Sequence, residues 1–190
     1  MNYAGFSIEY APTRTHAAAT IIIFDNNRNP FEEKTVLFRP SLPHSQENRF
    51  ARDKEGFEQV SHLVENPLDL LAFYRKTYYP EYDLAHQIGK EFHLRTYTIA
   101  DSLGEGTYLP LVKQSGAIQP VWLNDYVIAY ALRTKSNQKP VYLALGHLTS
   151  KKNVIPLTFQ FVQEYRIPEI VRLAKNKSKQ TLREKLHDLL

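Results

Sequence analysis

The feature that most constrains this chain is the run Ala17–Asp25, a nearly unbroken stretch of alanine, isoleucine, threonine and phenylalanine. β-branched side chains favour strands, and a strand without polar alternation is typical of one buried on both faces. The run is far shorter than the roughly 20 residues that a membrane-spanning helix needs. It therefore predicts a central strand of a sheet that is covered on both sides.

Two further strands are predicted beside this one. Residues 6–11 alternate apolar and polar side chains and end at Pro12, and residues 34–39 end at Pro40. The polar segment Asn26–Pro30 is a strong turn signal between the second and third strands. Three short strands with tight links predict an antiparallel meander.

Helices and strands then alternate along the rest of the chain. Apolar spacing predicts a helix over 57–64, a second helix that restarts at Asn66-Pro67 and continues through Tyr74, and a third that begins at Pro80. Residues 95–100 read as a strand and 101–119 as a long loop. The remaining predicted elements are a helix over 122–133, strands over 140–145 and 156–162, and amphipathic helices from Pro168 onward.

This order predicts an α/β (or α+β) fold whose mixed sheet begins with the meander. We expect an α/β core over 1–165 and a basic helical element over 166–190 that packs on it. Three antiparallel strands followed by alternating helices and strands resembles the order of RNase H-like proteins. That resemblance implies acidic residues at strand ends that hold two divalent cations for phosphodiester cleavage.

Cysteine is absent from the 190 residues, which excludes disulfides, thiolate metal sites and a cysteine nucleophile. The first twelve residues lack the basic start and apolar run of a signal peptide. We therefore expect a soluble, cytoplasmic protein without a membrane partner.

The positive charge is unevenly distributed. Residues 151–190 carry nine basic and four acidic side chains, a net charge of +5, whereas the other 150 residues have a net charge of −1. Such an asymmetry suggests nucleic acid or an acidic protein as the partner. A second segment, residues 74–82, interleaves tyrosines with cations, as in proteins that stack bases and contact phosphates. The predicted nucleic-acid-binding residues are Arg75, Lys76, Tyr78, Tyr79, Arg172, Lys175, Lys177, Lys179 and Arg183.

Two carboxylate sets could support hydrolysis. Following the RNase H-like resemblance, Glu9, Asp101 and Asp125 would converge and hold Mg²⁺, although the first-strand acid of that family is usually Asp. The second set is the triplet Glu32-Glu33-Lys34 after Asp25, because an E-x-K pattern at the start of a strand is typical of another metal-dependent nuclease fold. Charges around a hairpin turn explain this second pattern more simply.

No motif names a reaction, and three hypotheses remain. The leading one is a non-catalytic nucleic-acid-associated protein without a cofactor, as a subunit of a larger assembly. The alternatives are a metal-dependent nuclease that uses Glu9, Asp101 and Asp125 with Mg²⁺, and an adaptor that binds a protein through its C-terminal helix.

Overall fold

The computed structural model describes residues 1–187, which form a mixed α/β fold, as predicted. By its internal packing the chain divides into two compact units. Unit 1 contains Met1–Leu71 and the last helix from Ile170 onward, and unit 2 contains Ala72–Glu169. Unit 2 is therefore an insertion within the sequence of unit 1.

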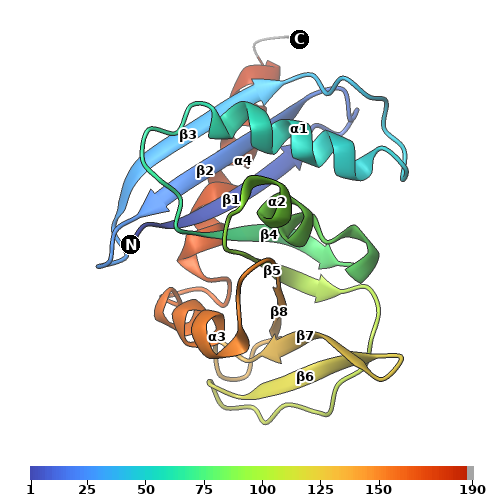
Figure 1. Cartoon of the computed structure of the whole chain (residues 1–190), viewed down its shortest axis with the longest axis vertical. Helices are drawn as coiled ribbons and strands as arrows, with labels where there is room; N and C mark the ends of the chain where they lie inside the picture. The colour runs from blue at the N-terminus through green and yellow to red at the C-terminus, as the bar shows by residue number, and fades with distance from the viewer. Residues whose placement is uncertain (188–190) are drawn as a thin grey trace. The chain divides into compact units, whose positions relative to one another are not determined.

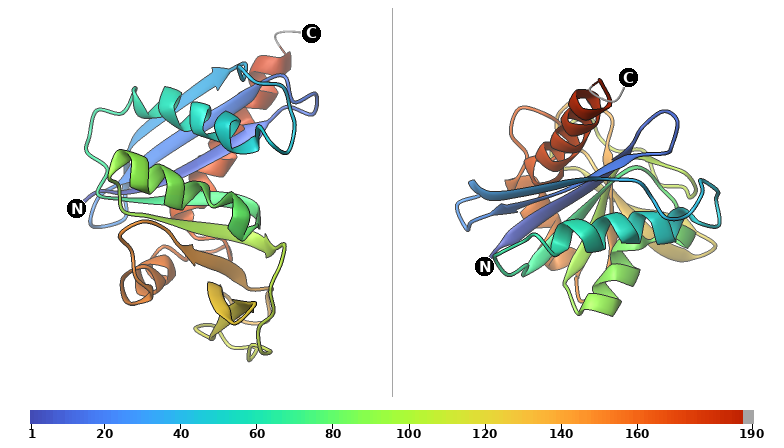
Figure 2. Two further views of the ribbon diagram at one scale, coloured as in Figure 1. Left: turned by 45° about the vertical axis from the view of Figure 1, so that its right-hand side comes forward. Right: turned by 90° about the horizontal axis from the view of Figure 1, so that it is seen from above.

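Unit 1 is built on three antiparallel strands in the order β3-β2-β1, which confirms the meander. All eight residues of the middle strand are buried, as its unbroken apolar run predicts. Figures 1 and 2 show one helix on each face of this meander. The elements are β1 (Tyr3–Tyr10), β2 (Ala17–Phe24), β3 (Pro30–Phe38), α1 (Arg49–Ser61) and α4 (Glu169–His187).

Helix α4 is a single helix, and one of its faces is docked on unit 1. The buried Ser178 hydroxyl donates to the carbonyl oxygen of Ser7 at 3.1 Å and lies 2.9 Å from the hydroxyl of Thr20. A methyl group at Gly5 would lie 1.5 Å from the carbonyl oxygen of Ile170, so only glycine allows the helix to come this close. The described part of the C-terminal segment therefore has the amphipathic character that its spacing predicts.

Unit 2 contains the strands in the order β4-β5-β8-β7-β6, and the last four pair antiparallel with their neighbours. Helix α2 packs against β5, and helix α3 packs against β8. The strands are β4 (Leu70–Tyr78), β5 (Thr96–Leu103), β6 (Ile118–Leu123), β7 (Tyr126–Leu132) and β8 (Val141–Leu145). The helices are a short 3-10 turn (Pro80–Tyr82), α2 (Leu84–Phe92) and α3 (Lys151–Gln160).

Two predicted helices are strands. The segment expected to be a helix from Asn66-Pro67 through Tyr74 instead contains strand β4. Residues 70–74 of this strand are all buried, so their apolar run fits the spacing of a helix as well as that of a strand. The helix expected over 122–133 is the β6–β7 hairpin (Figure 1). Its turn residues Asn124 and Asp125 have positive φ angles of 47° and 67°, which is the geometry of a tight two-residue hairpin turn.

One predicted strand is a helix. Residues 156–162 alternate apolar and polar side chains, yet Leu157 and Thr158 are consecutive in helix α3 and both are buried. Pro156 lies inside this helix, where its missing N–H would normally argue against helical structure. Within residues 1–187 no helix is long and apolar enough to span a membrane.

Candidate functional site

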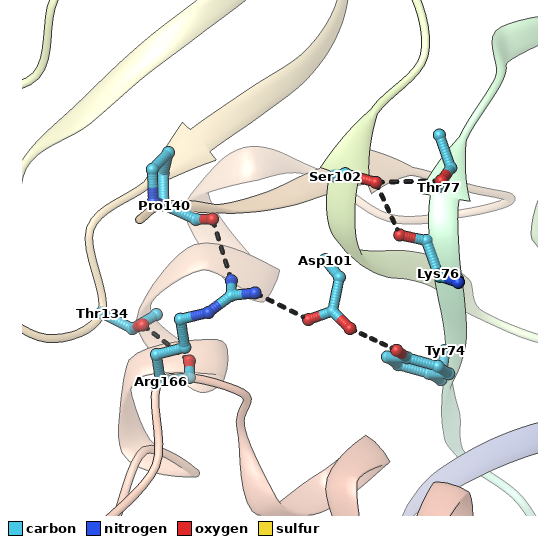
Figure 3. A network of polar contacts seen from close by, with 8 residues as sticks. All are labelled: Tyr74, Lys76, Thr77, Asp101, Ser102, Thr134, Pro140 and Arg166. Carbon is cyan, nitrogen blue, oxygen red and sulfur yellow. Dashed lines mark hydrogen bonds and ion pairs between the residues drawn. The ribbon is translucent and has the colours of Figure 1, made fainter. Parts of the chain in front are cut away.

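The carboxylate of Asp101 on β5 lies at the centre of a network of polar contacts in unit 2. It follows the buried Ile99 and Ala100, which fix the strand in the core. One carboxylate oxygen, Oδ1, accepts a hydrogen bond from Nη2 of Arg166 at 3.0 Å. The other, Oδ2, accepts one from the hydroxyl of Tyr74 on β4 (Figure 3). Both oxygens of Asp101 therefore have side-chain donors.

Arg166 lies between α3 and α4 and is held by three contacts. Besides its bond to Asp101, its Nη1 donates to the carbonyl oxygen of Pro140 at 3.0 Å. Its own carbonyl oxygen accepts from the hydroxyl of Thr134 at 2.6 Å. The side chains of Arg166 and Asp101 remain 24% and 21% exposed, so the ion pair is fixed but still open to solvent.

The strand ends next to this pair carry further polar groups. The Ser102 hydroxyl donates to the carbonyl oxygen of Lys76 at 2.9 Å and lies 2.9 Å from the Thr77 hydroxyl (Figure 3). The side chain of Lys76 is exposed. Burial, together with a hydrogen bond to Tyr108, raises the pKa of Tyr142 well above its ordinary value. Tyr142 is therefore a neutral hydrogen-bonding group at physiological pH rather than a base.

The network does not fit a divalent cation at Asp101. A divalent cation there would lie beside the positively charged guanidinium of Arg166, which would repel it, and would share oxygens that already accept from this guanidinium and from the Tyr74 phenol. The guanidinium already supplies the positive charge that balances the carboxylate. Among residues 1–187, no group of three or more histidine, cysteine, aspartate or glutamate side chains is arranged to hold a metal ion.

The structure also separates two of the predicted catalytic residues. Ala100 is level with Tyr142 and Ala131 across β5, β8 and β7, whereas Asp125 lies in the turn before β7 begins. Strand spacing and rise place Asp125 roughly 20 Å from Asp101. The two carboxylates therefore cannot bind one cation, and the expected three-carboxylate centre is not formed. Glu9 lies on β1 of unit 1, opposite Ala18.

The second carboxylate set has structural contacts. Asp25 Oδ1 accepts from the backbone N–H groups of Asn27 and Asn29, so it closes the turn between β2 and β3. Lys34 pairs with Glu65 at 2.5 Å. Glu32 accepts from the backbone N–H groups of residues 65 and 66; these bonds help lower its pKa, against the opposing effect of burial. These contacts support the hairpin-charge interpretation.

The predicted nucleic-acid-binding residues of the 74–82 segment differ in exposure. Tyr78 is only 5% exposed, and burial raises the pKa of its hydroxyl, so it belongs to the core of unit 2. The ring of Tyr79 packs on Gly104, where a side chain would collide with it. Arg75 is half-buried and close enough to influence the pKa of Asp83. Of these four predicted residues, Lys76 is the one that is exposed.

The basic residues of α4 likewise differ. Lys177 forms an ion pair with Glu33 on β3 at 2.7 Å. Arg172 and Lys175 are half-buried and have partners of their own. Lys179 and Arg183 are exposed. Their role in nucleic-acid binding stays a prediction.

Sequence reasoning missed the part played by Arg166 and Tyr74. In the sequence Arg166 is one of nine basic residues between 151 and 190, and Tyr74 is one of several tyrosines in residues 74–82. The ion pair joins residues 65 positions apart, and no local pattern signals such a contact.

Solved structures of Endonuclease V proteins have the same fold as this chain. The crystal structure of Endonuclease V from Streptomyces avermitilis matches 98% of this chain and 83% of its own, with a TM-score of 0.88 and 22% identity. Endonuclease V from Ciona intestinalis, solved with a 24mer DNA containing an inosine followed by a ribo-adenosine, matches 96% of this chain and 86% of its own, with a TM-score of 0.77 and 17% identity. This likeness confirms the RNase H-like order as a matter of fold.

The family model described as Endonuclease V matches residues 80–176, just over half of the chain. The chain belongs to the Endonuclease V family. Endonuclease V of Dictyoglomus thermophilum is 30% identical over 99 residues, which are 52% of this chain and 43% of the relative. That of Petrotoga mobilis is 37% identical over 79 residues, which are 42% of this chain and 36% of the relative. The matched part thus spans less than half of each relative.

Family membership corrects the leading functional hypothesis. We expected a non-catalytic subunit of a larger assembly because the sequence shows no convincing catalytic set. That expectation is wrong, since the family model and the curated relatives that match this chain are endonucleases. The nuclease alternative agrees better with these findings. An acidic protein partner and the adaptor role stay predictions.

Proposed function

We propose that this chain acts on nucleic acid as an endonuclease. The observation that carries the proposal is the match to the Endonuclease V family over residues 80–176. The matched range contains Asp101, Pro140 and Arg166, and therefore the centre of the polar network. Because the structures from Ciona intestinalis hold inosine-containing DNA, we propose nucleic acid with a deaminated adenine base as the first substrate to test.

Arg166 is the group of this network best suited to a phosphate. A guanidinium presents planar donors that match phosphate oxygens, and it keeps its charge at every physiological pH. Asp101 and the carbonyl oxygen of Pro140 fix the direction of these donors. The exposed Lys76 adds a second cation on the neighbouring strand β4. We propose that Arg166 and Lys76 contact the backbone of the nucleic acid and that Asp101 positions Arg166.

The test is a strand-cleavage assay on an end-labelled oligonucleotide with one inosine, beside the same strand with adenosine. Parallel reactions contain Mg²⁺, Mn²⁺ or a chelator, so that no metal requirement is assumed. We expect cleavage of the inosine strand that Asp101→Asn reduces by about tenfold or more, as loss of a positioning contact does. Asp125→Asn is the matched control, because it removes the same charge at the exposed hairpin turn.

Three outcomes are informative. Absence of product under all three conditions would overturn the proposed endonuclease activity. Equal cleavage by the wild type and Asp101→Asn would show that the endonuclease activity exists but does not depend on Asp101. Loss of activity in Asp125→Asn would show that Asp125 is needed for cleavage, although the structure separates its carboxylate from that of Asp101.

A further inference from the structure

The β6–β7 hairpin of unit 2 exposes an unusual amount of apolar side chain. Trp122 is 46% exposed, Ile118 is 42% exposed and Val127 is 40% exposed. Two large apolar side chains of the preceding loop, Leu109 and Val112, are 71% and 66% exposed. Single exposed apolar residues are normal, but several on one short hairpin indicate a surface that contacts something.

The three exposed side chains of the hairpin itself, Ile118, Trp122 and Val127, share one of its faces. Trp122 lies opposite Val127, and Pro120 lies opposite Tyr130. Ile118 lies opposite Leu132, which is buried, so the exposed part of the face ends at this pair. The opposite face is formed by Val121, Ala129 and Ala131, which are at most 1% exposed and belong to a core cluster of unit 2. The hairpin therefore has one face for the core and one apolar face, here called the Trp122 face, on which Ile118, Trp122 and Val127 are exposed and the other two residues are half-buried. The Trp122 face consists of Ile118, Pro120, Trp122, Val127 and Tyr130.

A cation lies beside this face. The ammonium group of Lys151, the first residue of α3, lies 6.0 Å from the centre of the Tyr130 ring. The next residue, Lys152, is exposed as well. Rings next to lysines are the combination that binds single-stranded nucleic acid, because bases stack on the rings while phosphates pair with the cations. A purely apolar protein partner would not use the two lysines.

We infer that the Trp122 face is a stacking platform for an unpaired base of the nucleic acid, with Lys151 and Lys152 contacting the adjacent phosphates. The inference rests on the proposed function, because it takes nucleic acid as the ligand. It adds a binding element on the β6–β7 hairpin, which lies at the edge of the strand order and apart from the network around Asp101. Base stacking tolerates any sequence, so this contact would add affinity without selecting a base.

The experiment uses the one tryptophan of the chain as the probe. Wild-type protein is titrated with a fluorescein-labelled single-stranded oligonucleotide while anisotropy reports binding. An unlabelled strand of the same sequence is titrated while the emission of Trp122 is recorded. We expect the emission of Trp122 to fall and to saturate at the concentration where the anisotropy saturates.

Variants test the contribution of the ring itself. Trp122→Ala should weaken binding about 5- to 100-fold, the range seen for loss of one stacking contact, whereas Trp122→Phe should retain most of the affinity. Phe31→Ala is the matched control, because Phe31 is 48% exposed on β3 of unit 1 and lies outside the hairpin. We expect this control to bind like the wild type.

The outcomes separate this inference from the proposed function. If anisotropy detects no binding, the proposed function itself fails. If anisotropy shows binding while the emission of Trp122 and the affinity of Trp122→Ala are unchanged, only the stacking platform is refuted. Sedimentation velocity provides the last comparison: a wild-type dimer that Trp122→Ala dissociates, with unchanged oligonucleotide binding, would show that a second copy of the chain covers this face.

Discussion

The ion pair between Arg166 and Asp101 gives the most demanding test of the site. Replacing Arg166 by methionine keeps most of the side-chain length and removes two hydrogen bonds, to Asp101 and to Pro140, both 3.0 Å long. Hydrogen bonds to charged groups contribute roughly 1.5–3 kcal/mol each. Both side chains of the pair are about a quarter exposed, so water competes and the lower part of this range applies. We expect Arg166→Met to lower the free energy of unfolding by about 2–4 kcal/mol.

The assay is thermal and urea unfolding followed by circular dichroism. For a chain of this size, a loss of about 2–4 kcal/mol lowers the melting temperature by roughly 4–16 °C. A double-mutant cycle with Asp101→Asn isolates the pair, because asparagine still accepts from Tyr74 but carries no charge. We expect a coupling free energy of about 1–2 kcal/mol. A coupling below about 0.3 kcal/mol would refute the reasoning, since the two side chains would then act independently.

The same samples test the conclusion that Asp101 does not bind a divalent cation. A ligand that binds the folded state raises the melting temperature in proportion to the logarithm of its concentration. We expect about 5 mM Mn²⁺ to change the melting temperatures of the wild type and of Asp101→Asn equally. Stabilisation of the wild type alone would show that a cation competes successfully with Arg166 for this carboxylate.

Two further predictions concern stability. Gly5→Ala should lower the free energy of unfolding by about 1–3 kcal/mol or prevent the docking of α4, because the new methyl group collides with the Ile170 carbonyl; unchanged urea unfolding would contradict the close approach. Asp83, the N-cap of α2, accepts from the backbone N–H of His86, and burial raises its pKa above the ordinary value. The folded state thus holds this proton more tightly, so the contribution of Asp83 to stability falls as the pH rises through the raised pKa and is constant above it. Asp83→Asn should keep the cap and lose this pH dependence. Asp83→Ala should be about 0.5–2 kcal/mol less stable than Asp83→Asn, as measured by urea unfolding between pH 4 and 8. Equal pH profiles of stability for the wild type and Asp83→Asn would contradict the raised pKa of Asp83.

The parts of the fold predicted correctly are those in which local pattern and burial agree. The central strand β2 is buried on both faces, and its side chains carry no competing helical signal. Helix α2 has a polar N-cap and an apolar spacing of four, so Leu84 and Ile88 are both buried on one face. In β4 the local sequence pattern does not reveal the secondary structure. Its residues 70–74 are buried on both faces, and an unbroken apolar run has no period with which to distinguish strand from helix.

The β6–β7 hairpin was missed for a different reason. Its turn residues, Asn124 and Asp125, form a pair typical of hairpins, although the second residue is not the usual glycine. The surrounding residues are apolar on both faces of the hairpin, one packed on the core and the other exposed at Trp122 and Val127. An apolar face in solvent removes the alternation by which strands are recognised. The exposed apolar face therefore explains why the strands were not predicted, and the same face supports the inference of a binding surface on this hairpin.

The structure shows which of the basic residues behind the charge asymmetry are paired within the chain and which are exposed. The nine basic residues of 151–190 give this segment a net charge of +5, which suggests a polyanion as the partner. In the structure Arg166 forms an ion pair with Asp101 and Lys177 forms one with Glu33, and Arg172 and Lys175 have partners as well. The exposed cations include Lys151 and Lys152 at the start of α3, besides Lys179 and Arg183 on the last helix. Because an ion pair within the chain neutralises its cation, the exposed cations are the ones that can contact phosphates, and two of them, Lys151 and Lys152, lie beside the Trp122 face.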